Sequence, residues 1–217
     1  SQSRRYEGVH HQLRDLMKQG TLGDVTTVNC DFYLAPHFGG FRDAMESPLI
    51  LDMSIHHFDL IRMMAGCDPV SVYAHEFNPK GSWYKGDVAA SCIFEMSNGI
   101  IFTYRGSWCA EGCQTSWHGD WRFIGNKGTI CYEREQVRGQ TIKKAGGWMS
   151  ELEDLPFEPK APEFSGQHGA IREFIARIRG GKALPQGECH DNIKSRAMVF
   201  AAMESSRKGR RVPVKVM

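Results

Sequence analysis

Three residues that can carry out acid–base chemistry follow one another along one apolar segment of the sequence. Asp52, His56 and Asp59 lie within residues 49–64, where most of the other side chains are apolar. At about 100° of rotation per residue of an α-helix, the three side chains fall within an arc of about 60°. A carboxylate can orient an imidazole, and an imidazole near neutral pH can donate or accept a proton. The spacing is therefore compatible with a proton-transfer site on one stripe of a buried helix.

Spacing alone favours a simpler role for the same residues. Asp52 and His56 can form a structural polar pair, because polar groups inside an apolar environment are costly unless they are satisfied. Asp-x-x-x-His is also half of a metal site, but no second motif supplies further ligands, so no metal is predicted. Asp59 is interpreted as a packing partner of His56 or a substrate contact rather than a reacting group.

One arginine precedes this helix in a glycine-containing loop. Arg42 lies in the sequence Gly-Gly-Phe-Arg-Asp at 39–43. A guanidinium in such a loop can bind a polyol or a carboxylate. The alternative is a solvated surface side chain, and the sequence favours neither. Arg42 is retained as a candidate substrate-binding residue.

The remaining patterns predict the α+β class, with an open sheet dominated by antiparallel strands and helices packed on one face. Short turns join most of the strand candidates, which indicates a meander rather than βαβ units. Ser47 and Pro48 mark the start of the helix that carries His56. The predicted helices are 7–18, 48–65, 167–179 and 189–207, and the predicted strands are 25–34, 70–77, 88–96, 100–108, 117–124, 129–132, a pair within 136–155, and 212–216.

Composition excludes several function classes. The chain has 27 Lys and Arg against 25 Asp and Glu, a net charge of +2 that gives no support to nucleic-acid or membrane-surface binding. No apolar run approaches the roughly 18 residues of a membrane span. The 7 cysteines include no Cys-x-x-Cys pair, and we interpret them as reduced thiols of a cytoplasmic protein. No Gly-x-Gly-x-x-Gly loop is present, so no cofactor-binding residue is predicted in this chain.

Five segments together resemble the Gfo/Idh/MocA oxidoreductases, which include glucose–fructose oxidoreductase and inositol dehydrogenase. The segments are RRYEGVHHQLRDLMKQGTLGDV (4–25), LDMSIHHFDLIRMMAG (51–66), IGNKGTI (124–130), IREFIARIRGGKALP (171–185) and AMVFAAMESSRKGRRVPV (197–214). They occur in the order typical of the domain that follows the dinucleotide-binding domain in that family. The likeness covers nearly the whole chain, although serines stand at 47 and 54 where the family often has glycine.

The resemblance implies a fold, an activity and roles for the two candidate residues. The fold would be that of the dihydrodipicolinate reductase-like C-terminal domain of a two-domain dehydrogenase. Residues 1–217 would form a single substrate-binding and oligomerisation domain, with the N-terminal Rossmann domain absent from this chain. His56 would act as the catalytic acid or base and Asp52 would orient it. The intact protein would use NAD or NADP, whereas this fragment alone would bind no cofactor and be inactive.

The predicted substrate is a sugar, inositol or related polyol, and the predicted assembly is a homodimer through the sheet. Alternating strands such as 92–96 and 100–104 are apolar on both sides, which favours a covered second face. Two alternatives stay open. One is an NAD-dependent glycoside-cleaving enzyme of the same fold, and the other is a stand-alone dimerisation or binding module in which Asp52 and His56 are structural.

Overall fold

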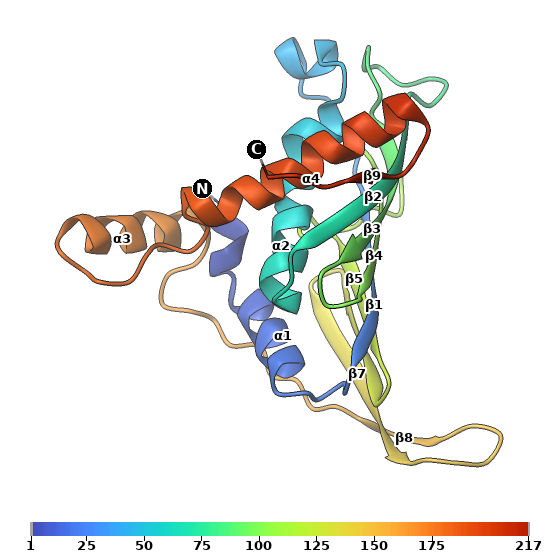
Figure 1. Cartoon of the computed structure of the whole chain (residues 1–217), viewed down its shortest axis with the longest axis vertical. Helices are drawn as coiled ribbons and strands as arrows, with labels where there is room; N and C mark the ends of the chain where they lie inside the picture. Colours follow the sequence, from blue (N-terminus) through green and yellow to red (C-terminus); the bar gives the residue numbers. More distant parts are fainter. Residues whose placement is uncertain (1, 217) are drawn as a thin grey trace.

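The computed structural model describes residues 2–216, and its centre is one open sheet of 9 strands in the order β8-β7-β6-β5-β1-β4-β3-β2-β9. Figure 1 shows this sheet nearly edge-on, with the helices gathered on one side. The α+β class predicted from sequence is confirmed. The strands are β1 (Val25–Tyr33), β2 (Pro69–Phe77), β3 (Ala89–Met96), β4 (Ile101–Ser107), β5 (Asp120–Gly125), β6 (Gly128–Glu133), β7 (Gln136–Lys144), β8 (Glu151–Asp154) and β9 (Val212–Pro213).

The predicted meander is interrupted in the middle of the sheet. Strand β1 lies between β4 and β5, pairing in parallel with β4 and antiparallel with β5. The remaining neighbours in the described sheet are antiparallel. Local turn signals show which consecutive strands form hairpins, but they carry no information about a strand inserted from the start of the chain. The meander prediction was therefore wrong between β4 and β5.

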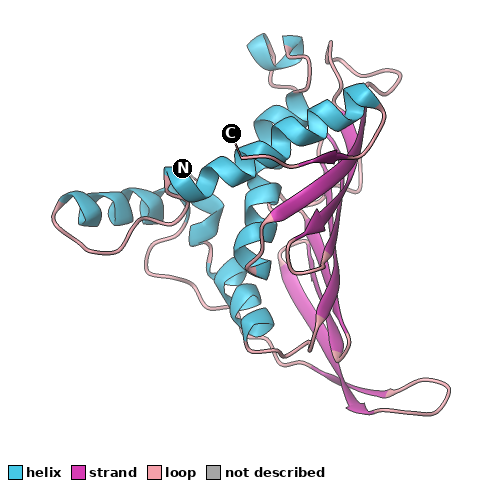
Figure 2. Ribbon diagram, viewed as in Figure 1, coloured by secondary structure: helices cyan, strands magenta, loops and turns pink. Residues whose placement is uncertain are grey.

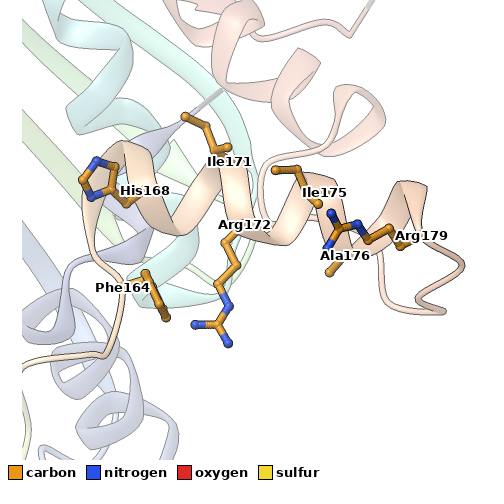
Figure 3. A pocket seen from close by; sticks show the side chains of 7 residues that line it. All are labelled: Phe164, His168, Ile171, Arg172, Ile175, Ala176 and Arg179. Atoms are coloured by element: carbon orange, nitrogen blue, oxygen red, sulfur yellow. The ribbon is translucent and has the colours of Figure 1, made fainter.

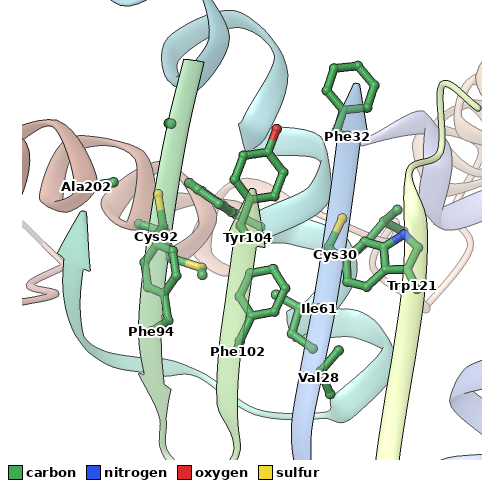
Figure 4. Packing of buried hydrophobic residues seen from close by; sticks show 14 of the residues in the cluster. Val28, Cys30, Phe32, Ile61, Cys92, Phe94, Phe102, Tyr104, Trp121 and Ala202 are labelled. Atoms are coloured by element: carbon green, nitrogen blue, oxygen red, sulfur yellow. The ribbon is translucent and has the colours of Figure 1, made fainter. Parts of the chain in front are cut away.

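Three helices cover one face of the sheet, namely α1 (Gly8–Lys18), α2 (Ile55–Ala65) and α4 (Cys189–Lys208). Figure 2 shows them stacked on the same side of the strands. Phe58 of α2 packs edge-on against Phe94 of β3 and Tyr104 of β4, with ring centroids 4.9 and 5.4 Å apart. Figure 4 shows the continuation of this core across the strands, where Phe102 and Trp121 lie stacked 5.9 Å apart. No helix in the described part of the chain is both long enough and apolar enough to cross a membrane.

Helix α3 (Gly166–Ile178) extends away from the sheet, contrary to the prediction that it covers a face (Figure 1). Its apolar positions are at least half-exposed at Ile171, Phe174 and Ile178. Figure 3 shows Ile171 and Ile175 projecting from the helix, and both side chains are exposed. The helix is held at its beginning, where Gly169 packs on the Tyr6 ring so closely that a Cβ would clash. Helical periodicity identifies an apolar face, but it does not identify what covers that face.

The seven cysteines are free thiols, as predicted, but they differ in environment. Cys30, Cys67, Cys92 and Cys131 are buried, and Cys109 is partly exposed. Cys113 and Cys189 are exposed, whereas the buried thiols pack as small apolar side chains.

A buried network of charges holds the start of the chain against α2 and α4. The Asp59 side chain is 1% exposed and accepts two hydrogen bonds from the Arg5 guanidinium, both 2.6 Å long. Ser195 of α4 donates to the same carboxylate at 2.8 Å. Arg5 and Arg62 both pair with Asp191 of α4. A buried charge is tolerated only when paired and hydrogen-bonded, so these contacts fix three elements relative to one another.

Replacing the central carboxylate should destabilise the whole chain. Asp59→Ala leaves the Arg5 guanidinium buried with one fewer partner, so we expect the free energy of unfolding to fall by about 3–5 kcal/mol. Urea-induced unfolding measures the change. Asp15→Ala is the matched control, because that carboxylate is half-exposed on α1, and its effect should stay within about 0.5 kcal/mol. Equal effects of the two substitutions would contradict the role of the network.

Candidate active site

The helix that carries the predicted catalytic residues begins as a π-helical segment, η3 (Leu49–Ser54), and continues as α2. The Ser54 hydroxyl donates to the Leu49 carbonyl at 3.1 Å inside the segment. Ser47 lies before the helix, and its carbonyl rather than its hydroxyl accepts the Leu51 amide. The wider turn of a π-helix changes the angle between successive side chains, and such segments occur frequently at functional sites. The α-helical spacing used to place Asp52 on the His56 stripe therefore does not hold across Ser54.

Asp52 pairs with Arg42. The Arg42 Nε donates to Asp52 Oδ2 at 2.6 Å, and both side chains are about one-third exposed. The short helix η2 (Gly40–Ala44) carries Arg42, whose guanidinium lies over the rings of Phe38 and Phe41 at 4.9 and 4.8 Å. The structure thus brings together two of the candidate residues, one from the loop and one from the helix.

His56 bonds to a residue at the start of the chain. Its Nδ1 lies 3.0 Å from Gln2 Oε1, and an amide oxygen only accepts, so Nδ1 carries the proton. The lone pair of Nε2 is then free to accept a proton. Burial lowers the pKa of His56 to about 4, the nearby Arg4 guanidinium lowers it further, and Asp52 opposes this shift. At neutral pH, His56 is therefore an uncharged base.

Gln2 and Arg4 complete the surroundings of His56, and sequence reasoning missed both. Arg4 lies 3.2 Å from His57 Nε2 and donates to the Met53 sulfur at 3.6 Å. Burial lowers the pKa of Arg4 to about 10, which leaves it a cation at neutral pH. No spacing rule connects residues 2 and 4 with residues 53–57, because the contact depends on the packing of the chain's beginning against α2.

Asp59 lies apart from this group. It is bonded to Arg5 and Ser195, and its side chain has almost no exposed surface. A substrate would have to displace those partners to reach the carboxylate. We therefore correct its assignment from a candidate substrate contact to a structural residue of the buried network.

An aromatic surface lies beside Arg42. Trp117 and Phe38 are each nearly half-exposed, with their ring centroids 6.5 Å apart. Trp108 and Trp121, in contrast, are buried in the core. The predicted strand from 117 begins only at Asp120, so Trp117 lies in the preceding loop, free to face a ligand.

One group of potential metal ligands occurs in the described part of the chain, at the N-terminus of α4. Glu188, Cys189 and His190 bring one ligand atom each within 4.8 Å of the others. The Glu188 carboxylate already accepts the amide hydrogens of His190 and Asp191 as the helix cap, and the positive end of a helix disfavours a cation. We assign this group a capping role.

Comparison with known proteins shows to which family a chain with these residues belongs. The family model described as the GFO/IDH/MocA C-terminal domain matches residues 10–131, which include Arg42, Asp52 and His56. The chain belongs to the GFO/IDH/MocA family. An uncharacterized protein, y4oX of Sinorhizobium fredii, is 29% identical over 230 residues and covers 99% of this chain. The resemblance inferred from the sequence is thus confirmed.

Solved structures share the fold. An oxidoreductase from Agrobacterium radiobacter in complex with NAD+, L-tartaric acid and magnesium superposes with a TM-score of 0.82 at 18% identity, covering 98% of this chain. A levoglucosan dehydrogenase in complex with NADH and L-sorbose gives a TM-score of 0.75 at 14% identity, covering all of it. The chain spans 61% of the length of y4oX and 64% and 65% of these two structures.

The protonation state of His56 provides a direct test of the site. We expect the imidazole to stay neutral, with its proton on Nδ1, from about pH 8 to about pH 5. Because its folded pKa of about 4 lies below the unfolded value of about 6.5, the unfolded chain takes up a proton first as the pH falls, and stability is lost across that interval. Two-dimensional NMR of 15N-histidine-labelled protein reports both the charge and the tautomer.

Gln2→Ala is the matched variant for this measurement. Removing the acceptor should mix the two tautomers without charging the ring at neutral pH. A His56 that carried its proton on Nε2 in the unmodified chain, or that titrated near pH 6.5, would contradict the geometry.

Proposed function

We propose that this chain is the substrate-binding half of an NAD(P)-dependent oxidoreductase that acts on a sugar, inositol or related polyol. The observation that carries the proposal is the neutral His56, with its Nδ1 held by Gln2 and its Nε2 free, next to the Asp52–Arg42 pair. Oxidation of a secondary alcohol requires a base for the hydroxyl proton, and a neutral imidazole serves this purpose.

The neighbouring side chains suit a polyhydroxylated substrate. The Asp52 carboxylate can accept a hydrogen bond from a hydroxyl group adjacent to the reacting carbon, while Arg42 donates to a second oxygen. The half-exposed rings of Phe38 and Trp117 offer flat apolar surfaces for the C–H face of a sugar ring. We assign His56 the proton transfer and Asp52 and Arg42 the orientation of the substrate.

The hydride acceptor would be a nicotinamide nucleotide held by a separate nucleotide-binding domain. The sequence of this chain contains no Gly-x-Gly-x-x-Gly loop, while the structures that share its fold are longer and hold NAD+ or NADH. The exposed apolar stripe of α3 supports the proposal, because an isolated helix of 13 residues gains little stability without a covering partner. This chain then supplies the substrate-facing groups only.

We also propose that the uncovered sheet face joins two copies of the chain. Tyr73 of β2 and Ile93 of β3 are paired in register on that face, and both are about half-exposed. Ile101 of β4 is 41% exposed. Contiguous apolar surface of this kind on a sheet is typical of an interface.

The enzymatic proposal is tested on the protein expressed from the complete reading frame that encodes this chain. With a panel of sugars, inositols and other polyols, we expect net formation of NADH or NADPH. His56→Gln should lower kcat by about 10²–10⁴-fold with an unchanged thermal midpoint, because only the proton acceptor is lost. His190→Gln, which alters an exposed histidine of α4, is the control and should keep full activity. Full activity of His56→Gln would refute the assignment, and glycoside cleavage without net reduced cofactor would favour the alternative chemistry.

The assembly proposal is tested by light scattering of the 217-residue chain. We expect a dimer that becomes a monomer in Ile93→Lys, because two lysines per interface would be buried without partners. Ile178→Lys on α3 is the matched control, since it places the same charge on an exposed apolar site outside the sheet, and it should remain dimeric. A monomer of the unmodified chain at high concentration would overturn the proposal.

A further inference from the structure

A second concave surface lies between α4 and the C-terminal segment that follows it. The chain reverses at Gly209, whose left-handed conformation (φ 59°) ends α4, and residues 210–215 then return alongside the helix (Figure 1). β9 holds this segment to β2, and the Val214 amide donates to the Val70 carbonyl at 2.9 Å. The groove so formed encloses about 800 Å³, within the range of small-molecule sites, and contains none of the residues of the candidate active site.

The floor of the groove is apolar because of how side chains alternate around α4. Met198, Val199 and Ala202 are buried against the sheet. The groove face instead presents Ile193, Ala197 and Phe200, and Phe200 remains 38% exposed. The hollow is open above Ala197 because that side chain is small, and the Phe200 ring forms an accessible apolar wall beside it.

The rim of the groove is cationic. Five basic side chains line it against one carboxylate, Glu204. Glu204 forms an ion pair with Lys208, with Oε1 and Nζ 2.5 Å apart, and Arg211 forms an ion pair with Glu95 of β3. Among the described residues, the three remaining cations, Arg196, Arg210 and Lys215, have no carboxylate within ion-pairing distance. The whole chain has a net charge of only +2, so the groove carries a local excess of positive charge that acidic residues elsewhere in the molecule balance.

We propose that this groove is a binding site for a small organic phosphate that carries an aromatic or other apolar group. Guanidinium groups bind phosphate oxygens through paired hydrogen bonds, and the free side chains of Arg196 and Arg210 lie on two walls of one hollow. Arg196 already lies over the Phe200 ring at 5.1 Å, so a flat apolar group on Phe200 would bring an attached phosphate beside this guanidinium. The site is independent of the proposed oxidoreductase chemistry.

Phenyl phosphate and inorganic phosphate together test the proposal on the 217-residue chain, by calorimetry and by amide NMR. We expect saturable binding of phenyl phosphate with a Kd near or below 1 mM, at least tenfold tighter than inorganic phosphate. The shifted amides should lie in residues 193–215. Binding should weaken as salt is added, because the rim charges are exposed.

Three variants separate the contributions of the two arginines and of the aromatic ring to phenyl phosphate binding. Arg196→Gln and Arg210→Gln should each weaken phenyl phosphate at least fivefold, and Phe200→Ser should remove its advantage over inorganic phosphate. Arg207→Gln is the matched control, because Arg207 lies on the same helix but lines a different hollow, beside Glu76 and Asp87. Thermal midpoints verify that each variant is folded.

The outcomes that would overturn the site are specific. Phenyl phosphate binding no tighter than inorganic phosphate would mean that charge alone attracts the anion. Equal weakening by Arg207→Gln and Arg210→Gln would mean that the helix, rather than the groove, is responsible. No saturation up to about 10 mM would mean that the groove is not a phosphate site.

Discussion

The burial of one carboxylate determines where the first residues of the chain lie. Asp59 is on the inner side of α2 with 1% of its side chain exposed, and a charge in that position requires partners that are equally buried. Arg5 and Ser195 supply them, from the beginning of the chain and from α4. Because Gln2 and Arg4 immediately precede Arg5, the same ion pair that stabilises the fold also places them against His56 and His57.

The chemistry of His56 follows from that placement. A histidine on a half-buried helix would lose its charge through desolvation alone, but desolvation does not decide which nitrogen carries the proton. Gln2 decides it by accepting from Nδ1, and the Arg4 cation further disfavours a second positive charge. The nearby Asp52 could have drawn the proton, but it is engaged by Arg42. Burial, the Arg4 cation and the Gln2 amide thus set the charge and the tautomer of His56, and the Arg5–Asp59 ion pair holds Gln2 and Arg4 in place.

Exposed apolar surface occurs in several clusters, which include the open sheet face, helix α3 and the groove beside α4, as well as the aromatic surface of Phe38 and Trp117 and the turn between β7 and β8 with Trp148 and Met149. One face of the sheet is covered by α1, α2 and α4, while the opposite face presents Tyr73 and Ile93. Helix α3 is attached through Gly169, which packs on Tyr6, and through Glu173, whose carboxylate accepts hydrogen bonds from the Tyr6 hydroxyl and the Gln186 amide, while its apolar side chains stay exposed. The outer face of α4 forms the hollow bordered by Arg196 and Arg210. A chain of this size has enough apolar residues to fill a core, so clusters of apolar side chains left outside it indicate surfaces that meet other molecules.

The sequence by itself determined the α+β class, the positions of most strands, the helix that carries His56 and the family, because these depend on local periodicity, turn chemistry and short ordered motifs. It also brought Arg42 and Asp52 into one candidate site. Only the tertiary structure decided that β1 inserts between β4 and β5, that Asp59 is structural, that α3 covers nothing in this chain, and that Gln2 and Arg4 face α2. These features depend on contacts between residues far apart in the chain, and on a π-helical turn that breaks the 100° spacing on which the helical stripe was based.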